Sequence, residues 1–346
     1  MRVRTVLSRR LVAVTSAAVL LAACGTGGSD ATGGETEQAA EGAQPDAVGD
    51  GELSTVRVSL LPTVTKAPMY LGMEKGFFAE EGLNVEENVV QSGAAVTAAV
   101  MSGEAHFASS ALVPTVTAAD KGLDVRVVMT AASATPPDAP TDAYGDSVII
   151  VAEDSDIQSI ADLNGTTIAV NALQAGLELA VRGTVDRLGG DSDTIEFLPV
   201  PFPEMVTALN DGHVDAIAPL EPFVSSATAA GHRVLHHAFP YDPDETGEFV
   251  NSVYFTSGVY ADENPEIVAA FRRAIERSNA YAEEHPDEVR SMIPIYTGIS
   301  EEVAAKIALP SYPSVMDLDA YRAEIELMAY YGFISGPVDE ARFYLD

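Results

Sequence analysis

The fold of this chain is decided by residues 85–110, VEENVVQSGAAVTAAVMSGEAHFASS. The valines at 85, 89 and 90 predict a short strand, and the small residues 94–101 predict a helix. Residues 105–108 predict a second strand that runs into Ser109-Ser110. A strand that passes through the turn Gln91-Ser92-Gly93 into a helix presents free backbone N–H groups to a small molecule. The same layout is also an ordinary turn of α/β domains, so this stretch alone leaves both interpretations open.

The layout returns later in the chain, where residues 205–219, MVTALNDGHVDAIAP, match residues 96–110, VTAAVMSGEAHFASS. In each copy a short helix ends at a glycine, a strand of small residues follows, and a second helix ends at another glycine before a further strand. The glycines are Gly103 and Gly122 in the first copy and Gly212 and Gly231 in the second. Two similar α/β units in one chain predict two lobes of similar build.

The length of 346 residues is enough to bury a full core and to form about two domains. The formal net charge is −33, and hydrophobic residues make up 47% of the chain, which indicates a globular body with an acidic exterior. Such a surface repels nucleic acid and anionic membranes, so neither is expected as a partner through charge attraction. We interpret the acidic residues as a solvated exterior rather than as a site for a cationic partner.

The N-terminus has the order of a secretory signal, with a basic segment at 1–10, a short apolar run, and Leu21-Ala22-Ala23 before Cys24. The apolar run is too short to span a bilayer stably. Leu-Ala-Ala-Cys resembles the lipobox of bacterial lipoproteins, which implies a signal peptide at 1–23 and a lipid on the thiol of Cys24. Because Cys24 is the only cysteine, no internal disulfide is expected in the mature fold.

Residues 24–54 are rich in Gly, Thr, Ala, Gln and Glu and contain no aromatic residue. Such a segment cannot bury enough apolar surface to offset the entropy lost on ordering. We therefore expect a flexible tether between Cys24 and the folded body, which begins with the strand VRVSL at 56–60. Ser8-Arg9-Arg10 leaves twin-arginine export open beside the general secretory route.

Ligands of open α/β sheets lie outside the carboxyl ends of the strands. In this chain those ends supply hydroxyls, amides, backbone N–H groups, one cation and one carboxylate, a set that suits a small polar solute. The candidate ligand-binding residues are Thr63, Thr65, Lys66, Ala67, Tyr70, Gln91, Ser92, Gly93, Ser109, Ser110 and Thr130 in the first half, and Asn171, Leu173, Gln174, Pro219, Glu221 and Phe223 in the second.

The charge of the ligand depends on Lys66 and Glu221. An anion would use Lys66 and helix N-termini, whereas a solute with an N–H or ammonium group would use Glu221 as an acceptor. Tyr70 or Phe223 can stack on a ring, or both can belong to the core of a lobe. The residues alone do not decide between these alternatives.

The sequence gives little support for a metal site or a catalytic centre. His232, His236 and His237 include a pair four residues apart, but residues 233–235 read as a strand, where that spacing need not converge. We therefore expect no metal site, no cofactor and no catalytic residue. The serine-elbow, phosphate-loop and zinc-protease motifs are all missing from the sequence.

From residue 56 to about 270 the chain resembles ABC-transporter solute-binding proteins of the branch that binds nitrate, alkanesulfonates, taurine or thiamine-pyrimidine precursors. The motifs that carry the resemblance are Ala67-Pro68-Met69-Tyr70, Lys75-Gly76-Phe77-Phe78, Glu81-Gly82-Leu83-Asn84-Val85, Ser92-Gly93, the segment DLNGTTIAV at 162–170, and Glu221-Pro222-Phe223. Their order along the chain is more specific than any one of them.

The resemblance implies an α/β type II periplasmic-binding fold, in which two lobes are joined by two crossing segments and hold the ligand in a cleft. Lobe 1 would comprise 55–146 and 252–346, and lobe 2 would comprise 147–251. The strands at 147–151 and 253–259 are the predicted crossings. One helix is expected at 69–78, and an amphipathic helix at 266–284 is expected to pack back on lobe 1.

The resemblance also implies a function. We expect a monomeric, lipid-anchored extracytoplasmic protein that captures a small polar organic solute, sulfonate- or taurine-like or nitrate-like, and delivers it to the permease subunits of an ABC importer. The alternatives are uptake of a thiamine pyrimidine precursor or related heterocycle and, as a different class, an enzyme of pyrimidine synthesis on the same fold. The lipobox and the missing cofactor motifs favour capture and delivery over catalysis.

Overall fold

The computed structural model describes residues 53–90, 93–134, 147–238 and 249–345. The leader with Cys24 and the turn residues Gln91 and Ser92 lie outside these ranges. Within the described ranges, no helix combines the length and the apolar character that crossing a membrane requires. The chain divides into two units, residues 1–44 and residues 45–346, and the described residues all belong to the second unit.

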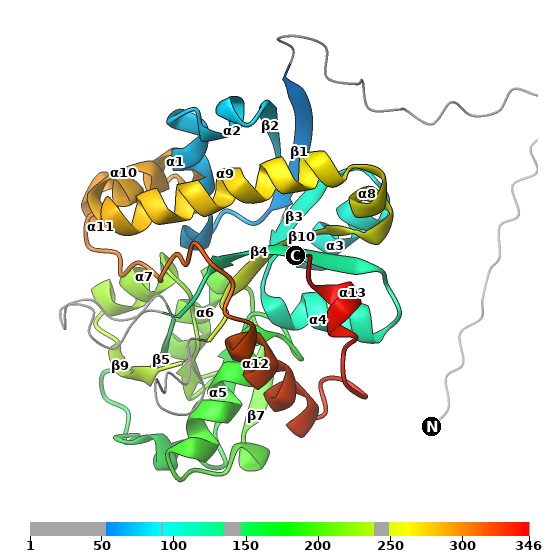
Figure 1. The fold of residues 1–346 in the computed structure, drawn as a ribbon. Helices are drawn as coiled ribbons and strands as arrows, with labels where there is room; N and C mark the ends of the chain where they lie inside the picture. The colour runs from blue at the N-terminus through cyan, green and yellow to red at the C-terminus, as the bar shows by residue number, and fades with distance from the viewer. Residues whose placement is uncertain (1–52, 91–92, 135–146, 239–248, 346) are drawn as a thin grey trace, which may run out of the picture. The chain divides into compact units, whose positions relative to one another are not determined.

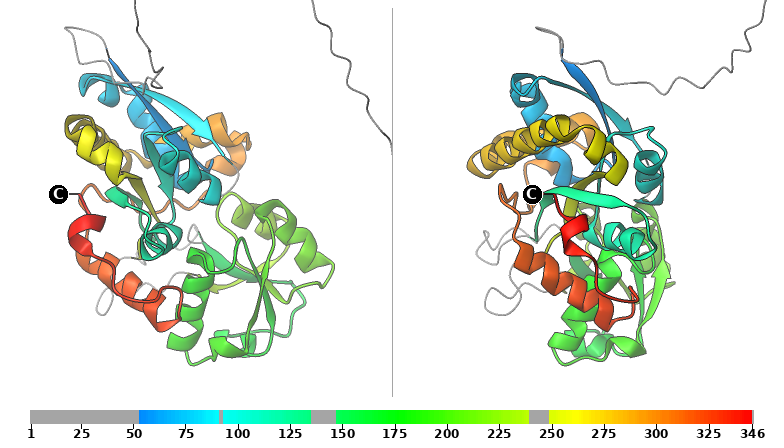
Figure 2. Two further views of the ribbon diagram at one scale, coloured as in Figure 1. Left: turned by 90° about the vertical axis from the view of Figure 1, so that its right-hand side faces the viewer. Right: turned by 45° about the vertical axis from the view of Figure 1, so that its right-hand side comes forward.

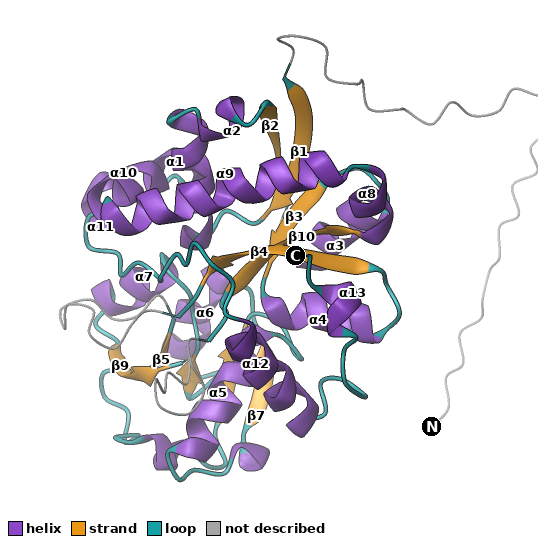
Figure 3. Cartoon of the chain, in the orientation of Figure 1, coloured by secondary structure: helices purple, strands orange, loops and turns teal. Residues whose placement is uncertain are grey.

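Two five-stranded sheets form the framework (Figures 1 and 3). The first has the order β2-β1-β3-β10-β4 and the second the order β7-β6-β8-β5-β9. The strands of the first sheet are β1 (Ser54–Leu60), β2 (Leu83–Val89), β3 (Phe107–Ser110), β4 (Val125–Ala132) and β10 (Ser252–Ser257). Those of the second are β5 (Val148–Val151), β6 (Thr167–Val170), β7 (Glu196–Pro199), β8 (Ala216–Ile217) and β9 (Arg233–His237).

The two sheets are copies of one topology, which confirms the repeat predicted from the sequence. In each, three strands pair in parallel, and a strand from elsewhere in the chain inserts antiparallel beside the third. The inserted strand is β10 in the first sheet and β5 in the second. The four repeat glycines all have positive φ, at 76° and 86° for Gly103 and Gly122 and at 68° and 94° for Gly212 and Gly231. Glycine adopts this conformation at low cost, which is why it ends the same helices in both units.

The first lobe consists of the first sheet with helices on both faces. Side chains alternate along its strands, so Val58 and Leu60 of β1 join one core with α1 and α9, and Phe255 of β10 joins another with α3 and α4. The helices are α1 (Ala67–Glu74), α2 (Phe77–Glu80), α3 (Gly93–Met101), α4 (Leu112–Asp120), α8 (Gly258–Glu263), α9 (Pro265–Glu284), α10 (Pro286–Thr297) and α11 (Glu301–Ala304), with a 3₁₀ turn η1 (Val64–Lys66). Helix α9 packs on this lobe, as was expected for the helix predicted at 266–284 (Figure 1).

The second lobe repeats this alternation. Ile168 and Val170 of β6 face α5, while Ala169 between them packs with α6 and α7. Its helices are α5 (Gly176–Arg187), α6 (Phe202–Asn210) and α7 (Phe223–Ala229), with 3₁₀ turns η2 (Ile160–Leu163) and η3 (Ser192–Thr194).

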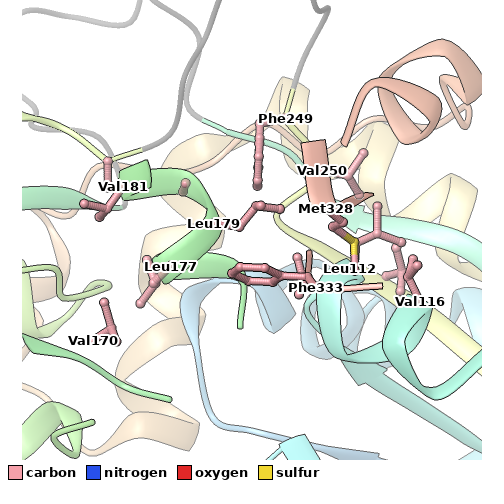
Figure 4. Packing of buried hydrophobic residues seen from close by; sticks show 14 of the residues in the cluster. Leu112, Val116, Val170, Leu177, Leu179, Val181, Phe249, Val250, Met328 and Phe333 are labelled. Atoms are coloured by element: carbon pink, nitrogen blue, oxygen red, sulfur yellow. The ribbon is translucent and has the colours of Figure 1, made fainter. Parts of the chain in front are cut away.

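A C-terminal segment with α12 (Leu318–Tyr330) and α13 (Glu340–Phe343) lies against both lobes (Figure 2). Helix α12 contacts α4 of the first lobe and α5 of the second. Figure 4 shows Leu112 of α4, Leu179 of α5 and Met328 of α12 meeting in one buried apolar cluster. The hydroxyl of Tyr331 donates to Asp186 of α5 at 2.6 Å. The lobe limits at 146/147 and 251/252 stay a prediction, and the last residues of the chain are shared between the lobes.

The predicted crossings differ from the structure in one respect. In the segment expected to cross at 147–151, residues 148–151 form the inserted antiparallel strand β5, and residues 253–257 of the other belong to the inserted strand β10. The chain after β4 meets the chain before β10, since the N–H of Ala134 donates to the carbonyl of Phe249 at 2.8 Å. The second strand also ends earlier than expected, at Ser257, because Gly258 starts α8 and the Ser257 side chain caps it.

A second correction concerns the helix predicted at 69–78. The structure has two helices there, α1 and α2, separated by Lys75-Gly76. Gly76 has φ 80°, a left-handed conformation that ends a helix. The apolar periodicity continues through the break, so the pattern alone did not reveal it.

Candidate functional site

A cavity of about 320 Å³ lies between the two lobes, at the carboxyl ends of the parallel strands. Eight of the predicted ligand-binding residues line it: Thr63, Thr65, Lys66, Ser109, Ser110, Asn171, Leu173 and Gln174. The residues that line it without having been predicted are Leu61, Ala111, Pro114, Ala172, Ala175, Gly176, Leu177, Phe202, Leu220, Phe249, Val250, Asn251, Ser252 and Glu324. The volume suits a small solute rather than a polymer.

Lys66 is the cation of this cavity. It is the last residue of η1 and precedes α1, which places it after the carboxyl end of β1. Its side chain is 2% exposed, and burial lowers its pKa to about 7. Its Nζ lies 5.9 Å from the ring centre of Tyr254, and it has no hydrogen-bond or ion-pair partner among the described residues. Burial therefore favours the neutral form of this amine, and an anionic group beside it would favour the charged form.

The hydroxyl groups of the first lobe are partly engaged. Ser109 donates to the carbonyl of Val253 at 3.0 Å, which ties the end of β3 to the inserted strand. Thr63 and Thr65 share a hydrogen bond of 2.9 Å between their hydroxyls. Each of these groups keeps capacity for one more partner, because a hydroxyl both donates and accepts.

The second lobe contributes the loop between β6 and α5. Gln174 has φ 51°, and its N–H donates to the carboxylate of Glu178 at 2.7 Å. Glu178 is held in turn by Arg182 at 2.9 Å. This buried pair fixes the loop at the start of α5, so that Asn171 and Leu173 reach the cavity.

Among the lining residues that were not predicted, Phe249 and Glu324 come from segments without a strand-end signal. Phe249 precedes β10, and Glu324 lies on α12. Glu324 is 3% exposed; one carboxyl oxygen accepts the N–H of Val250 at 3.1 Å, and the other has no hydrogen-bond partner. Burial raises its pKa well above the usual range. The sequence shows Glu324 only as an acidic residue in a helical stretch.

Among the described lining residues, one lysine and one glutamate are ionisable, and burial shifts both pKa values toward the uncharged forms. The rest of the lining is apolar or carries hydroxyl and amide groups. This arrangement favours an uncharged solute with a few hydrogen-bonding atoms over a strong anion.

Four predicted contacts have other partners and do not line the cavity. The hydroxyl of Tyr70 donates to Glu87, and its ring stacks on Tyr296 with centroids 4.3 Å apart. Thr130 shares a hydrogen bond of 2.9 Å with the hydroxyl of Tyr321. Phe223 lies behind the lining residue Phe202 at 5.6 Å between ring centroids.

Glu221 is the most informative of the four. It is 3% exposed and accepts from both the N–H and the hydroxyl of Ser225, at 3.1 and 2.9 Å. It therefore stabilises the first turn of α7 and is not part of the cavity lining. Ala67 and Pro219 also lie outside the lining. Gln91 and Ser92 are outside the described residues, and Gly93 is described only as the first residue of α3.

The histidines do not form a site. Among the described residues, no group of three His, Cys, Asp or Glu side chains is arranged to hold a metal ion. The ring of His236 lies 6.2 Å from that of His237 at nearly a right angle, with its Nδ1 within 3.0 Å of the His237 carbonyl oxygen.

The fold and the cavity together define a two-lobed protein of the periplasmic-binding class, and comparisons with known proteins specify the family. Residues 64–289 match the family model described as NMT1/THI5 like. This match covers more than half of the chain, which therefore belongs to the NMT1/THI5-like family. The branch of solute-binding proteins that the sequence motifs indicated is thereby confirmed.

One curated relative is the formylaminopyrimidine-binding protein of Halalkalibacterium halodurans, which is 27% identical over 248 residues, 70% of this chain and 71% of that protein. Among solved structures, the periplasmic aliphatic sulphonate binding protein SsuA of Escherichia coli matches with a TM-score of 0.66 and 19% identity, over 84% of this chain and 92% of that one. The alkanesulfonate-binding protein SsuA of Xanthomonas axonopodis pv. citri, bound to MOPS, matches with a TM-score of 0.68 and 16% identity, over 85% and 99% of the two chains. At these identities the structures show the fold.

Proposed function

We propose that this protein is the solute-binding component of an ABC importer and that it captures a small, uncharged nitrogen heterocycle of the aminopyrimidine type between its lobes. The observation that carries the proposal is the cavity itself, which is largely apolar and in which burial favours the neutral forms of both Lys66 and Glu324. The heterocycle that we place first was the alternative in the expectations drawn from the sequence.

Two further features support this class of solute. Phe202 and Phe249 both belong to the cavity lining, and aromatic side chains suit a flat, largely apolar solute. Glu324 holds a carboxyl oxygen without a partner, a group that suits the nitrogen edge of a heterocycle. The curated relative that covers most of this chain is named for a formylaminopyrimidine.

A sulfonate or taurine-like solute is the second candidate, because Lys66 is a cation without a partner among the described residues and two similar structures are sulfonate-binding proteins. A nitrate-like solute would use the same group. Against this candidate, no second cation belongs to the described lining of the cavity, so Lys66 alone would balance the charge of a bound sulfonate.

Binding without turnover is part of the proposal, since the relatives above are binding proteins by name. The test is a thermal-shift screen of the purified body with formylaminopyrimidine, simple aminopyrimidines, taurine, ethanesulfonate and nitrate, followed by titration calorimetry of each hit. We expect a heterocycle to raise the melting temperature and to be recovered unchanged. A shift with sulfonates alone would favour the second candidate, and chemical conversion of a bound heterocycle would overturn the transport function.

The location of the protein in the cell is also part of the proposal. Cys24 would carry the lipid that anchors an otherwise monomeric protein on the outer side of the cell membrane, within reach of the permease. Labelling with a radioactive fatty acid should mark the wild-type protein and leave Cys24→Ala unlabelled and released. Label that persists in the variant would refute the anchor at Cys24.

A further inference from the structure

Glu324 is a buried group of the cavity lining whose hydrogen bonding the described residues do not complete. It comes from α12, outside both repeats, and lies beside Val250. Its Oε2 accepts the N–H of Val250 at 3.1 Å, while its Oε1 has no hydrogen-bond partner among the described residues. A buried oxygen left in this state costs free energy, and such groups are rare in native proteins unless a ligand or water completes them.

Ser252 presents a second group of the same kind. It is the first residue of β10, two residues after Val250, and it is 3% exposed. Its hydroxyl has no hydrogen-bond partner, and the residue lines the same cavity. Two residues that line one cavity each carry a buried polar atom without a partner, next to the same stretch of backbone, and a common ligand explains this better than two separate defects.

We propose that Glu324 and Ser252 form a hydrogen-bonding subsite that reads the nitrogen-bearing edge of a neutral solute and so sets the specificity of the cleft. This inference rests on the proposed function, because it assumes that the solute occupies this cavity. The Glu324 side chain acts as a neutral acid: its carbonyl oxygen accepts the Val250 N–H, and its hydroxyl donates to a ring nitrogen. The Ser252 hydroxyl accepts from, or donates to, the neighbouring substituent.

The surroundings of Glu324 fit a neutral acid. The ionisable side chains that act on it or share its cavity are Lys66 from the end of η1, Tyr321 from the preceding turn of α12, and Tyr344 near the C-terminus. Burial raises the pKa of both tyrosines, so they stay uncharged. Lys66 is the one cation of this set, and burial favours its neutral form as well.

Conservative substitutions test the role of the proton. An amide has the shape of a neutral carboxylic acid and keeps one acceptor and one donor, so Glu324→Gln should bind formylaminopyrimidine within about threefold of the wild type. Glu324→Leu loses both groups and should bind roughly 10- to 100-fold more weakly, and Ser252→Ala about tenfold more weakly. Glu326→Gln, which removes an exposed carboxylate from the same helix, is the matched control and should leave the affinity unchanged.

The pH profile supplies a readout that a purely structural role would not move. Wild-type affinity should fall as rising pH ionises Glu324, and this fall should disappear in Glu324→Gln. Titration of Lys66 is separated from that of Glu324 by repeating the profile in Lys66→Met. Melting curves of the unliganded variants show which of them fold, and if Glu324→Leu does not, the Gln and Ser252 variants still decide.

Three results would overturn the subsite. Glu324→Leu or Ser252→Ala binding as tightly as the wild type would remove the group concerned from the site, with the transport function left standing. A Gln variant as weak as the Leu variant would show that the ionised carboxylate is needed, which contradicts a neutral acid. If no heterocycle binds to the wild type at all, the proposed ligand class fails and the subsite fails with it.

Discussion

The two α/β units have one topology but give the cavity different chemistry. In each unit the first parallel strand leads to a residue that precedes the first helix and lines the cavity. In the first unit this residue is Lys66, a buried cation, and in the second it is Ala175. Topology therefore places the chain at the cavity, while the single residue at that place decides what chemistry it offers.

The segment after the third strand shows the opposite contrast. In the first unit Ser109 and Ser110 end β3 and line the cavity. In the second unit the polar residue at the corresponding turn, Glu221, is used by Ser225 at the start of α7. The turn after the same strand can thus serve the site in one lobe and the start of its own helix in the other. Variants of Lys66, Glu221 and Gln174 test this difference between the two units.

The largest change in the free energy of unfolding is expected for Lys66→Met. Burial lowers the folded-state pKa of Lys66 to about 7, against an ordinary value of 10.5, so the unfolded chain binds more protons between these two pH values. The wild-type free energy of unfolding should therefore rise with pH across this window, and the cost of burying the charge is fully present below pH 7. Replacement by methionine should stabilise the protein by about 3–5 kcal/mol at pH 6 and by little at pH 10.5.

Urea unfolding of both proteins at a series of pH values measures this difference. Lys121→Met is the matched control, because Lys121 is exposed after α4 of the same lobe and should show no pH-dependent difference. A Lys66→Met difference that stays constant from pH 6 to 10.5 would mean that the lysine keeps its ordinary pKa in the cavity.

A middle-sized effect is expected for Glu221→Ala. It removes both bonds to Ser225 and should lower the free energy of unfolding by about 1–2 kcal/mol. Ser225→Ala, which loses the hydroxyl bond and keeps the N–H bond, should cost less. Calorimetric affinity for the solute should be unchanged in both variants. A large loss of affinity in a well-folded Glu221→Ala protein would return Glu221 to the binding site, as the sequence had suggested.

The smallest effect is expected at Gln174, the one non-glycine residue with positive φ among the described residues. A left-handed backbone costs about 1 kcal/mol for a residue with a Cβ atom, and glycine is free of that cost. Gln174→Gly should therefore be more stable than Gln174→Ala by roughly 1 kcal/mol in urea unfolding, the reverse of the order at most positions. Equal stability would show that the loop relaxes out of this conformation.

The sequence by itself determined the architecture. Periodicity and paired glycines revealed two α/β units, because helix and strand patterns and left-handed turns are local properties of the chain. The strand-end rule then found eight residues of the cavity, including Lys66 and Gln174. The motifs also indicated the family, which the match to residues 64–289 confirmed.

Only the tertiary structure decided which polar residues are available to a ligand. Glu221 follows a predicted strand and Glu324 lies in a helical stretch, so the local pattern pointed to Glu221 and not to Glu324. One has its carboxylate bonded to the backbone and hydroxyl of Ser225, and the other keeps an oxygen without a partner in the cavity. The reason is physical: α12 reaches the cavity through long-range packing against α4 and α5, and burial without a partner, which gives Glu324 its chemistry, exists only after that packing.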